Sequence, residues 1–374
     1  MTASNNYNFR IETFEEQYFD SIKDLVRTGW NPNHVLLKSD VLFRWHYRGF
    51  GKNAGIRFPI VFDGDKIIGY RMMTPIELIF SDINGNHTII PLSASSLYYV
   101  DSNYRGMKLG VMLEQHVINY YGGYFTIAAN PVTAVPILKR SGCKMIDQML
   151  RYFRPLSNDI SPIFIGEHYP QWNLIDSDKF IEPCSITAEE LSTIWTKSID
   201  GVRLTALNRS KDFWQWRYLD DPIYKYFFFK NQFGVIVARI CSIFNEHYEK
   251  TAYKVLRILE IIPTEQNVWS GSRSEGLSAL IDGVCGWGKA QGCLAAEFYT
   301  TSSRLDMVMN MACFEEINTN NYLSTRILSY FEPASNSHRL TNVGILSSLL
   351  PEDFDYENSY FTLSDADQDR PNII

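Results

Sequence analysis

The sequence predicts an α/β protein with two domains in tandem, each built on a mixed, mostly antiparallel sheet flanked by helices. Three observations support this prediction. The chain has 374 residues, which suits two domains of roughly 150 residues each. A strand, a glycine-containing turn and a helix follow one another over 93–121. The second half of the chain then repeats the order of elements expected for the first half.

The chain begins with an expected strand over 7–13, followed by two helices. Thr13 and Glu16 have the spacing of a capping box, and an amphipathic pattern follows as far as Gly29. The second helix contains the aromatic run FRWHY at 43–47. This order predicts one strand and two helices before the main sheet.

Two hairpin signals come next. The apolar runs 56–62 and 66–73 are joined by Asp-Gly-Asp at 63–65, and Asn-Gly at 84–85 marks a further turn. The sequence therefore predicts antiparallel strands that lead into the strand over 93–100.

The junction between this strand and the helix over 109–121 has the features of a phosphate site. The first N–H groups of a helix have no intrahelical partner and carry the positive end of the helix dipole. Glycines allow a ligand to approach the backbone, and cations add full charge. The residues concerned are Arg105, Gly106, Lys108 and Gly110.

A second strand and helix continue the pattern. The run YFTIAA at 124–129 predicts a buried strand, and Asn130-Pro131 begins a turn. A short helical run then ends at Gly142-Cys143. We therefore expect two successive strand–helix units, which place two loops side by side.

These two elements resemble the acyl-CoA-binding region of the GNAT superfamily of N-acyltransferases. In that family, a strand ending in Val, a turn, R-G-x-G-x-G and a helix hold the pyrophosphate of coenzyme A, and a later strand ends in Asn. The matching residues are Val100, Tyr104, Arg105, Gly106, Leu109, Gly110 and Asn130. The sequence departs from the motif at Lys108, where the family has Gly.

The resemblance implies that acyl-CoA, either acetyl-CoA or a short hydroxyacyl-CoA, is a co-substrate and that no metal takes part. It implies that the fourth strand supplies backbone donors to the oxyanion near 97–100. The cofactor-binding residues that it implies are Leu97, Tyr99, Val100, Arg105, Gly106, Met107, Lys108, Leu109, Gly110 and Asn130.

The usual catalytic side chains of the family are missing. Ser96 occupies the strand position of the Glu base, and Leu138 occupies the position of the Tyr acid. An amino group on a sugar is less basic than a Lys amine, so it needs less help to lose its proton. We therefore consider Ser96, Tyr98 and His34 as catalytic candidates; a structural role is the alternative for His34.

The second half repeats the first. Thr187 and Glu190 have capping-box spacing, and WQWRY at 214–218 follows FRWHY at an offset of 171. A helix is expected over 276–290 and a strand over 294–300. This order indicates an internal duplication, with convergent use of core aromatics as the alternative.

The two copies are not equal. The loop PTEQNVWSGSRSEG of the second copy has no Arg-Gly pair and has an early acidic residue, so we expect this copy to have lost the cofactor and to contribute to the acceptor site. The expected domains are an acyl-CoA domain at 1–156, a linker at 157–182, a degenerate domain at 183–350 and an acidic tail at 351–374.

The acceptor is expected to carry phosphates. Two arginines, Arg203 and Arg209, precede Trp214, and Arg can grip a diphosphate while an aromatic ring stacks on a base. Arg side chains over apolar surface and Trp in the core are the alternative. Trp30 lies in the loop that shapes the acceptor side in the family.

The chain also resembles tandem GNAT proteins of bacterial surface-polysaccharide (O-antigen) assembly. This implies transfer of an acyl group to a nucleotide-linked amino deoxysugar, with dTDP as the expected nucleotide. The alternatives are an acyltransferase for peptide or other small amines and a non-catalytic acyl-CoA-binding regulator.

Composition excludes other classes. Net charge is −7, but 351–374 holds seven acidic residues and one Arg, so the remaining body is nearly neutral, which argues against a nucleic-acid partner. The six cysteines lack metal-ligand spacing and point to the reduced cytoplasm. There is no signal-peptide pattern and no apolar run of the roughly 20 residues that a membrane helix needs, so no membrane partner is expected.

Overall fold

The computed structural model describes residues 7–30, 32, 34–164, 174, 179–244, 249–317 and 341–366. The chain forms two compact units, and neither of them is continuous in sequence. Unit 1 comprises Met1–Glu77, Ile90–Ile146 and Asn342–Pro351, and unit 2 comprises Leu78–Ile89, Asp147–Thr341 and Glu352–Ile374.

Unit 1 is built on a mixed sheet whose strands run in the order β1-β2-β3-β4-β5-β14-β6. The strands are β1 (Phe9–Thr13), β2 (Pro59–Asp63), β3 (Lys66–Ser81), β4 (His87–Val100), β5 (Gly123–Ile127), β6 (Lys144–Ile146) and β14 (Val343–Ser347). The helices are α1 (Phe19–Gly29), α2 (Val35–Lys38), α3 (Asp40–Arg48), α4 (Leu109–Tyr121) and α5 (Val135–Arg140).

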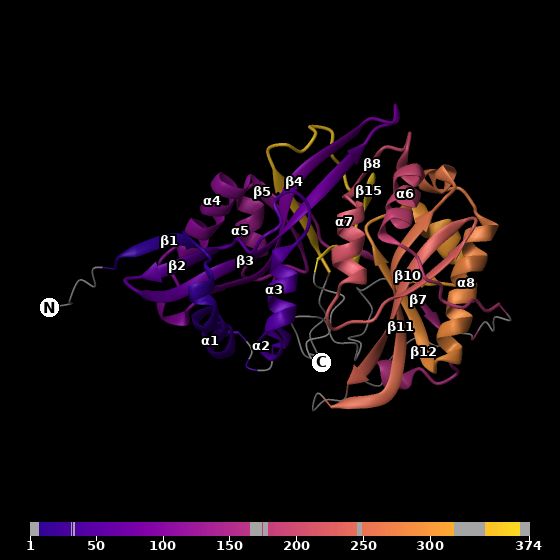
Figure 1. Ribbon diagram of the computed structural model, residues 1–374, viewed down its shortest axis with the longest axis horizontal. Coiled ribbons are helices and arrows are strands. Elements are labelled where there is room, and N and C mark those ends of the chain that lie inside the picture. The colour runs from indigo at the N-terminus through magenta and orange to yellow at the C-terminus, as the bar shows by residue number, and fades with distance from the viewer. Residues whose placement is uncertain are drawn as a thin grey trace. The chain divides into compact units, whose positions relative to one another are not determined.

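Helices cover both faces of this sheet. Figure 1 shows α1, α2 and α3 on one side of β1, β2 and β3, and α4 and α5 on the other. Beneath α4, Leu109 and Leu113 pack against Val61 of β2 and Ile68 of β3. This apolar contact holds the beginning of α4 close to the end of β4.

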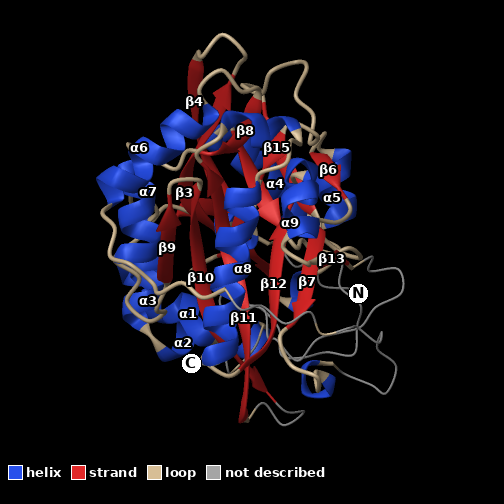
Figure 2. Ribbon diagram, turned by 90° about the vertical axis from the view of Figure 1, so that its right-hand side faces the viewer, coloured by secondary structure: helices blue, strands red, loops and turns tan. Residues whose placement is uncertain are grey.

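Unit 2 has a second mixed sheet in the order β13-β7-β12-β11-β10-β9. Its strands are β7 (Leu150–Pro155), β9 (Phe227–Asn231), β10 (Gly234–Phe244), β11 (Lys250–Pro263), β12 (Cys293–Thr300) and β13 (Glu315–Glu316). The helices are α6 (Ala188–Ile199), α7 (Lys211–Trp214), α8 (Glu275–Ala290) and α9 (Asp306–Met311). Figure 2 shows α8 lying across β10, β11 and β12.

A small strand pair completes unit 2. β8 (Leu204–Leu207) pairs with the end of β3 at 78–81, and β15 (Ser359–Tyr360) pairs with β8 in parallel. The segment Leu78–Ile89, which contains the end of β3 and the beginning of β4, therefore belongs to unit 2.

Each sheet includes a strand from the other half of the chain. β14 lies between β5 and β6 in unit 1, although it follows unit 2 in sequence. β7 pairs with β12 in unit 2, although it directly follows β6 of unit 1. The compact units therefore differ from the contiguous ranges 1–156 and 183–350, because backbone pairing joins segments that are remote in sequence.

The fold class predicted from the sequence is confirmed: the protein is α/β, with mixed, mostly antiparallel sheets flanked by helices. In unit 1, α1, α2 and α3 precede the β2–β3 hairpin, and β4, α4, β5 and α5 follow it. In unit 2, α6, β8 and α7 precede the β9–β10 hairpin, and β11, α8, β12 and α9 follow it. In each unit one parallel pair, β4 with β5 and β11 with β12, is connected through the long helix α4 or α8.

The expected acidic tail is corrected in part. Residues 359–366 are buried in unit 2, where Tyr360, Phe361 and Thr362 have no exposed surface. Asp365, one of the acidic residues of this segment, is buried and is bound by Arg209. Residues 367–374 lie outside the described part of the chain.

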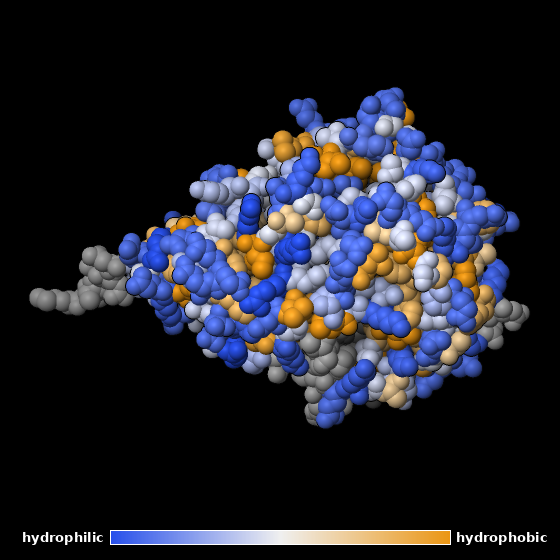
Figure 3. All heavy atoms as spheres, in the orientation of Figure 1, coloured by the Kyte–Doolittle hydropathy of each residue, from blue (hydrophilic) through white to orange (hydrophobic). Residues whose placement is uncertain are grey.

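The visible surface is mixed in character. On the face shown in Figure 3, hydrophobic residues form small patches separated by hydrophilic ones. Within the described ranges, no helix combines the length and apolar character needed to cross a membrane.

Candidate functional site

The turn between β4 and α4 forms an open cradle of backbone N–H groups. α4 begins at Leu109 without a side-chain cap. In the described part of the chain, no acceptor binds the N–H groups of Gly106 or of residues 108–111. Such groups, at the positive end of a helix of 13 residues, suit an anionic ligand.

Two cations flank this cradle. Arg105 and Lys108 are exposed, and neither forms an ion pair with another described residue. Gly106 has φ of 87°, and a Cβ there would meet no atom within 4 Å. The turn therefore leaves its backbone accessible and adds two positive charges, as predicted from the sequence.

Lys108 takes the backbone conformation of the glycine that it replaces. Its φ is 62°, in the left-handed region that favours Gly, and it is the N-cap residue of α4. The departure from the motif thus leaves the turn intact, at the cost of local strain.

The strands beside the cradle separate. β4 pairs with β5 only at Ala94 with Phe125 and Ser95 with Thr126, although β4 continues to Val100. Beyond Ser95, the edge of β4 toward β5 is therefore available for backbone hydrogen bonds to a ligand. This is the stretch where oxyanion donors are expected.

Several predicted cofactor residues have side chains that are buried in the core or cap a local turn, so that only their backbone could meet a ligand. Leu97 and Leu109 are 1% exposed and lie in the core. Val100 and Met107 pack against the cluster beneath α4. The Asn130 side chain accepts hydrogen bonds from the N–H groups of Val132 and Thr133, so it caps its own turn.

A buried ion pair lies behind β4. Arg71 of β3 binds Glu114 of α4 and donates to Ser95 Oγ at 3.0 Å. Glu114 also accepts a hydrogen bond from Tyr124 at 2.8 Å. This pair was not predicted from the sequence, although one signal was present: each charge lies within an otherwise apolar strand or helix pattern.

The Arg71–Glu114 ion pair positions Tyr98. Its ring lies over the Arg71 guanidinium, 5.1 Å from the ring centre, and its hydroxyl donates to the carbonyl of Gly110. Burial raises the pKa of Tyr98, so the hydroxyl remains protonated. The geometry gives Tyr98 a positioning role in the cradle in place of the expected catalytic one.

Ser96 faces the other side of β4. Its Oγ lies 3.1 Å from the Tyr47 hydroxyl of α3 and 3.4 Å from the Met72 carbonyl. Ser96 is half-buried, whereas Tyr47 is fully buried. Ser96 and Tyr98 are both half-buried, but the Tyr98 hydroxyl donates to the Gly110 carbonyl, so Ser96 remains the catalytic candidate on β4.

His34 is a structural residue. It is fully buried, and its Nδ1 accepts a hydrogen bond from the N–H of Leu36 at the start of α2. Burial lowers the pKa of His34 to about 3. The prediction of a catalytic base is corrected, because a side chain without exposed surface does not reach a substrate amine.

An aromatic surface lies at the end of α1. Trp30 is 38% exposed. A Cβ on the preceding residue, Gly29, would lie 2.3 Å from the Tyr99 ring, so only glycine allows Tyr99 to pack there. The Tyr99 ring is 5.8 Å from that of Tyr70. Trp30 is therefore exposed at the end of α1, whereas the Tyr99 ring packs against Gly29 and lies near Tyr70.

Two of the predicted acceptor residues are in the core of unit 2. Arg209 is 0% exposed, donating to Glu260 at 3.0 Å and to both oxygens of Asp365. Burial alone would lower the pKa of Arg209, but the attraction of Asp365 and Glu260 outweighs it and raises that pKa. Trp214 is fully buried as well. Both assignments are corrected.

Arg203 keeps an exposed guanidinium. Its side chain is 46% exposed and pairs with Asp353 at 2.7 Å. A diphosphate would have to displace that carboxylate.

In unit 2, the chain itself occupies the place that corresponds to the strand opening of unit 1. The Tyr360 hydroxyl accepts from the N–H of Ile261 in β11 at 2.9 Å. Beside β12, the Thr301 N–H donates to the Phe361 carbonyl at 2.9 Å. These contacts block an extended ligand between the two strands, which agrees with the loss of the cofactor expected for this copy.

No cluster of three or more His, Cys, Asp or Glu side chains in the described ranges is arranged to hold a metal ion.

No protein-family model matches the sequence, and no curated protein matches it. The structure is similar to a GCN5-related N-acetyltransferase from Kribbella flavida, with a TM-score of 0.52 and 12% identity over 90% of this chain and 71% of that chain. It is also similar to the Saccharomyces cerevisiae N-myristoyltransferase with bound myristoyl-CoA, with a TM-score of 0.50 and 9% identity over 98% of this chain and 89% of that chain. At these identities the similarity establishes the fold, and the fold of this chain is that of the GCN5-related N-acetyltransferases.

Proposed function

We propose that this protein is an acyl-CoA-dependent N-acyltransferase whose acyl-CoA site is in unit 1. The observation that carries the proposal is the cradle at 105–111, where open backbone N–H groups, an unobstructed Gly106 and two cations without ion pairs among the described residues meet at the start of α4. A pyrophosphate carries the charge and the acceptor oxygens that this arrangement suits.

The adjacent strand opening supports the rest of the proposal. Pairing between β4 and β5 stops at Ser95, so an extended thioester arm can lie along 96–100 and hydrogen-bond to the β4 backbone. N–H groups of β4 would stabilise the oxyanion that forms when the amine attacks the carbonyl. The C–N bond forms, the C–S bond breaks, and the coenzyme A thiolate takes up the proton that the amine loses.

We assign to Ser96 the removal of the proton from the acceptor amine. The Ser96 hydroxyl can accept the amine proton and relay it through water toward the coenzyme A thiolate, while Tyr47 holds the hydroxyl in place. A hydroxyl is a weak base, so this arrangement suits an amine of low basicity better than a Lys side chain.

The acceptor that we favour is the amino group of a nucleotide-linked amino deoxysugar. Trp30 supports it, because an exposed aromatic face can bind a sugar ring or a base. The burial of Arg209 and Trp214 removes two of the residues first expected to hold the nucleotide, and Arg203 is the exposed cation that remains of that set.

A peptide amine is the second candidate. The similarity to the N-myristoyltransferase extends over 98% of this chain, so an N-acyltransferase with a bound long-chain acyl-CoA shares this fold throughout. The two candidates differ in whether a diphosphate is needed for recognition.

The binding test is calorimetry with coenzyme A. Gly106→Val should abolish binding, because a β-branched residue at this φ distorts the turn and covers the cradle. Gly122→Val is the matched control: φ is 71° at the other end of α4, and a Cβ there also meets nothing within 4 Å. Undiminished binding by Gly106→Val would overturn the assignment of the cradle.

The activity test follows thiol release from acetyl-CoA with three amines: a dTDP-linked amino sugar, the free amino sugar and a short peptide. Preference for the nucleotide-linked sugar supports the favoured acceptor. Equal rates with the free sugar exclude a diphosphate site, and preference for the peptide supports the second candidate. Coenzyme A binding without turnover of any amine supports a regulator.

A further inference from the structure

A pocket of about 540 Å³ lies on unit 2, beyond the carboxyl ends of β11 and β12. These strands are parallel neighbours, and ligand sites gather where the loops leave such ends. One wall is the loop before α8, and the other is the segment that contains α9. The lining includes Gly271, Arg273, Ser303, Met307, Asn310 and Met311.

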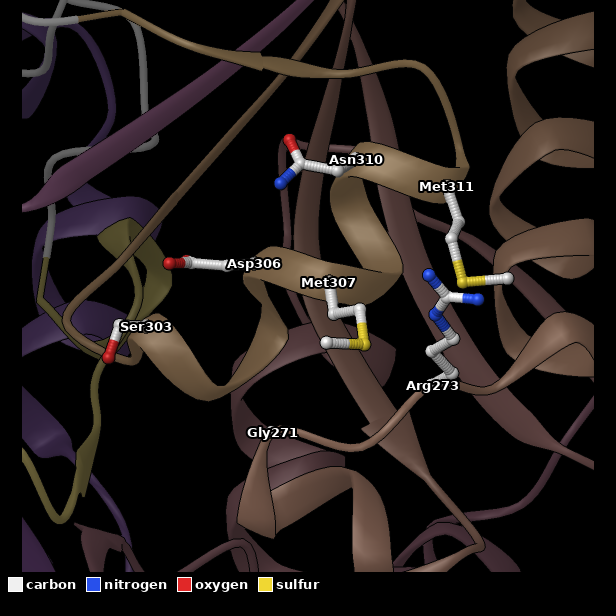
Figure 4. A pocket seen from close by; sticks show the side chains of 7 residues that line it. All are labelled: Gly271, Arg273, Ser303, Asp306, Met307, Asn310 and Met311. Atoms are coloured by element: carbon white, nitrogen blue, oxygen red, sulfur yellow. The ribbon is translucent and has the colours of Figure 1, made fainter.

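The pocket contains an uncompensated cation. Arg273 is exposed and forms no ion pair or hydrogen bond with any other described residue. The one acidic side chain of the lining, Asp306, accepts a hydrogen bond from the Tyr152 hydroxyl. In Figure 4, Asp306 points away from Arg273, so this carboxylate does not neutralise the guanidinium.

Two methionines supply the large apolar side chains of the lining, beside the polar Ser303 and Asn310. Met307 is 40% exposed and Met311 is 36% exposed, which is high for large apolar side chains. Figure 4 shows the Met311 thioether beside the Arg273 guanidinium, with Met307 facing the same opening. Thioethers adapt their shape and pack well against flat rings.

The ligand must also be compact. Tyr360 and Phe361 fill the space farther along β11 and β12, as described above, so a long arm cannot pass between these strands. A volume of about 540 Å³ is sufficient for a small molecule.

We propose that this pocket binds a compact organic anion. Arg273 grips a carboxylate or phosphate group, which a planar guanidinium does with two parallel hydrogen bonds. Met307 and Met311 pack against the apolar body of the same ligand. This site is separate from the acyl-CoA site of unit 1 and does not depend on it.

The test uses three probes with one aromatic body: benzoate, phenyl phosphate and the neutral benzamide. Protein labelled with ¹³C at the methionine methyl groups reports where each probe binds, and Met307→Leu and Met311→Leu assign the two signals. We expect benzoate, phenyl phosphate or both to shift the Met307 and Met311 signals, with saturation at roughly millimolar concentration. Benzamide should leave both unchanged.

Arg273→Gln should weaken binding of the anions at least tenfold, as expected for the loss of one charge-assisted contact. Lys211→Gln is the control, since Lys211 is an exposed cation of unit 2 outside the pocket. Tighter binding of phenyl phosphate would identify a phosphate ligand, and tighter binding of benzoate a carboxylate.

Three results would overturn the proposal: no saturable shift with either anion, equal binding of benzamide, or unchanged affinity in Arg273→Gln. The experiment should give the same result in Gly106→Val, whose unit 2 is unaltered. A failure of coenzyme A binding in unit 1 is therefore distinguishable from a failure of this site.

Discussion

The hydroxyl of Tyr98 donates a hydrogen bond to the backbone carbonyl of Gly110, which ties the end of β4 to the first turn of α4. A Cβ on Gly110 would lie 3.1 Å from this hydroxyl, a tight contact that glycine avoids. Arg71 lies against the Tyr98 ring and is itself held by Glu114. The cradle is therefore supported by a chain of contacts that reaches into the core of unit 1.

Tyr98→Phe should weaken coenzyme A binding by roughly three- to tenfold and lower the free energy of unfolding by about 1 kcal/mol, because one hydrogen bond is lost. The pH dependence of kcat should remain unchanged, since Tyr98 positions the cradle and does not exchange a proton. Calorimetry and a pH–rate profile check this. A hundredfold loss of kcat with unaltered affinity would instead make Tyr98 catalytic.

Lys108→Gly should raise the free energy of unfolding by about 1 kcal/mol. The left-handed backbone at Lys108 costs about this much for a residue with a Cβ, and glycine avoids the cost. Gln115→Gly, in the middle of the same helix, is the control and should lower stability by a similar amount. Denaturant unfolding of the three proteins measures both effects, and a loss of stability in Lys108→Gly would contradict the argument.

His34→Asn should leave the pH dependence of activity near neutrality unchanged. The substitution should instead change the stability of the protein at acidic pH. Because burial lowers the pKa of His34 to about 3, the unfolded chain binds a proton below about pH 6.5 that the folded chain does not. Stability is therefore lost as pH falls from about 6.5, by about 2 kcal/mol at pH 5.

The Asn side chain can still cap α2 but does not titrate, so thermal unfolding of His34→Asn should show a shallower loss between pH 6.5 and 5. Equal slopes for the two proteins would mean that His34 is solvated.

Asp365→Asn should change the pH dependence of stability in the opposite sense. Burial and the nearby charge of Glu260 raise the pKa of Asp365 to about 7, despite the opposing effects of Arg209 and of the Thr362 N–H. The unfolded chain loses this proton near pH 4, so the contribution of Asp365 is present at low pH and is lost as pH rises to about 7. The stability of the parent relative to Asp365→Asn should fall by up to about 4 kcal/mol between pH 4 and 8.

Chemical unfolding at several pH values measures this difference. Asp353→Asn, at an exposed carboxylate, is the control. A difference that grows with pH would show that the Arg209 charge dominates at Asp365.

Coenzyme A should bind with a stoichiometry of one per chain. Unit 2 lacks a comparable strand opening, because Tyr360 binds the backbone of β11 and Phe361 binds the residue after β12. Calorimetry with the full chain gives the stoichiometry directly. Two equivalent sites would contradict the block in unit 2.

Short-range patterns were sufficient for most elements and for the cradle. The strand, turn and helix over 93–121 were predicted, and they became β4, the cradle and α4. Thr187 caps α6 through the N–H of Glu190, as its spacing indicates. Such features depend on residues within about one turn of each other, so sequence spacing is enough to specify them.

The same pattern failed at Thr13, because this residue ends β1 and pairs with Pro59 of β2. Here, a strand partner 46 positions away outweighed a local cap. Arg209 and Asp365 repeat the lesson at longer range, since they lie 156 positions apart and neutralise one another in the core. The sequence around Arg209 does not indicate Asp365 as its partner, and the sequence around Asp365 does not indicate Arg209.

The order of the strands in the sheets was also decided by the tertiary structure. β14 enters unit 1 between β5 and β6 from nearly 200 residues away, and Asn342 then binds the backbone at Ala129 where β5 ends. Hydrogen-bonded pairing and burial act between segments brought together in space, whatever their distance along the chain. Spacing therefore predicted the turn whose backbone N–H groups remain open, and burial determined which charged side chains stay exposed.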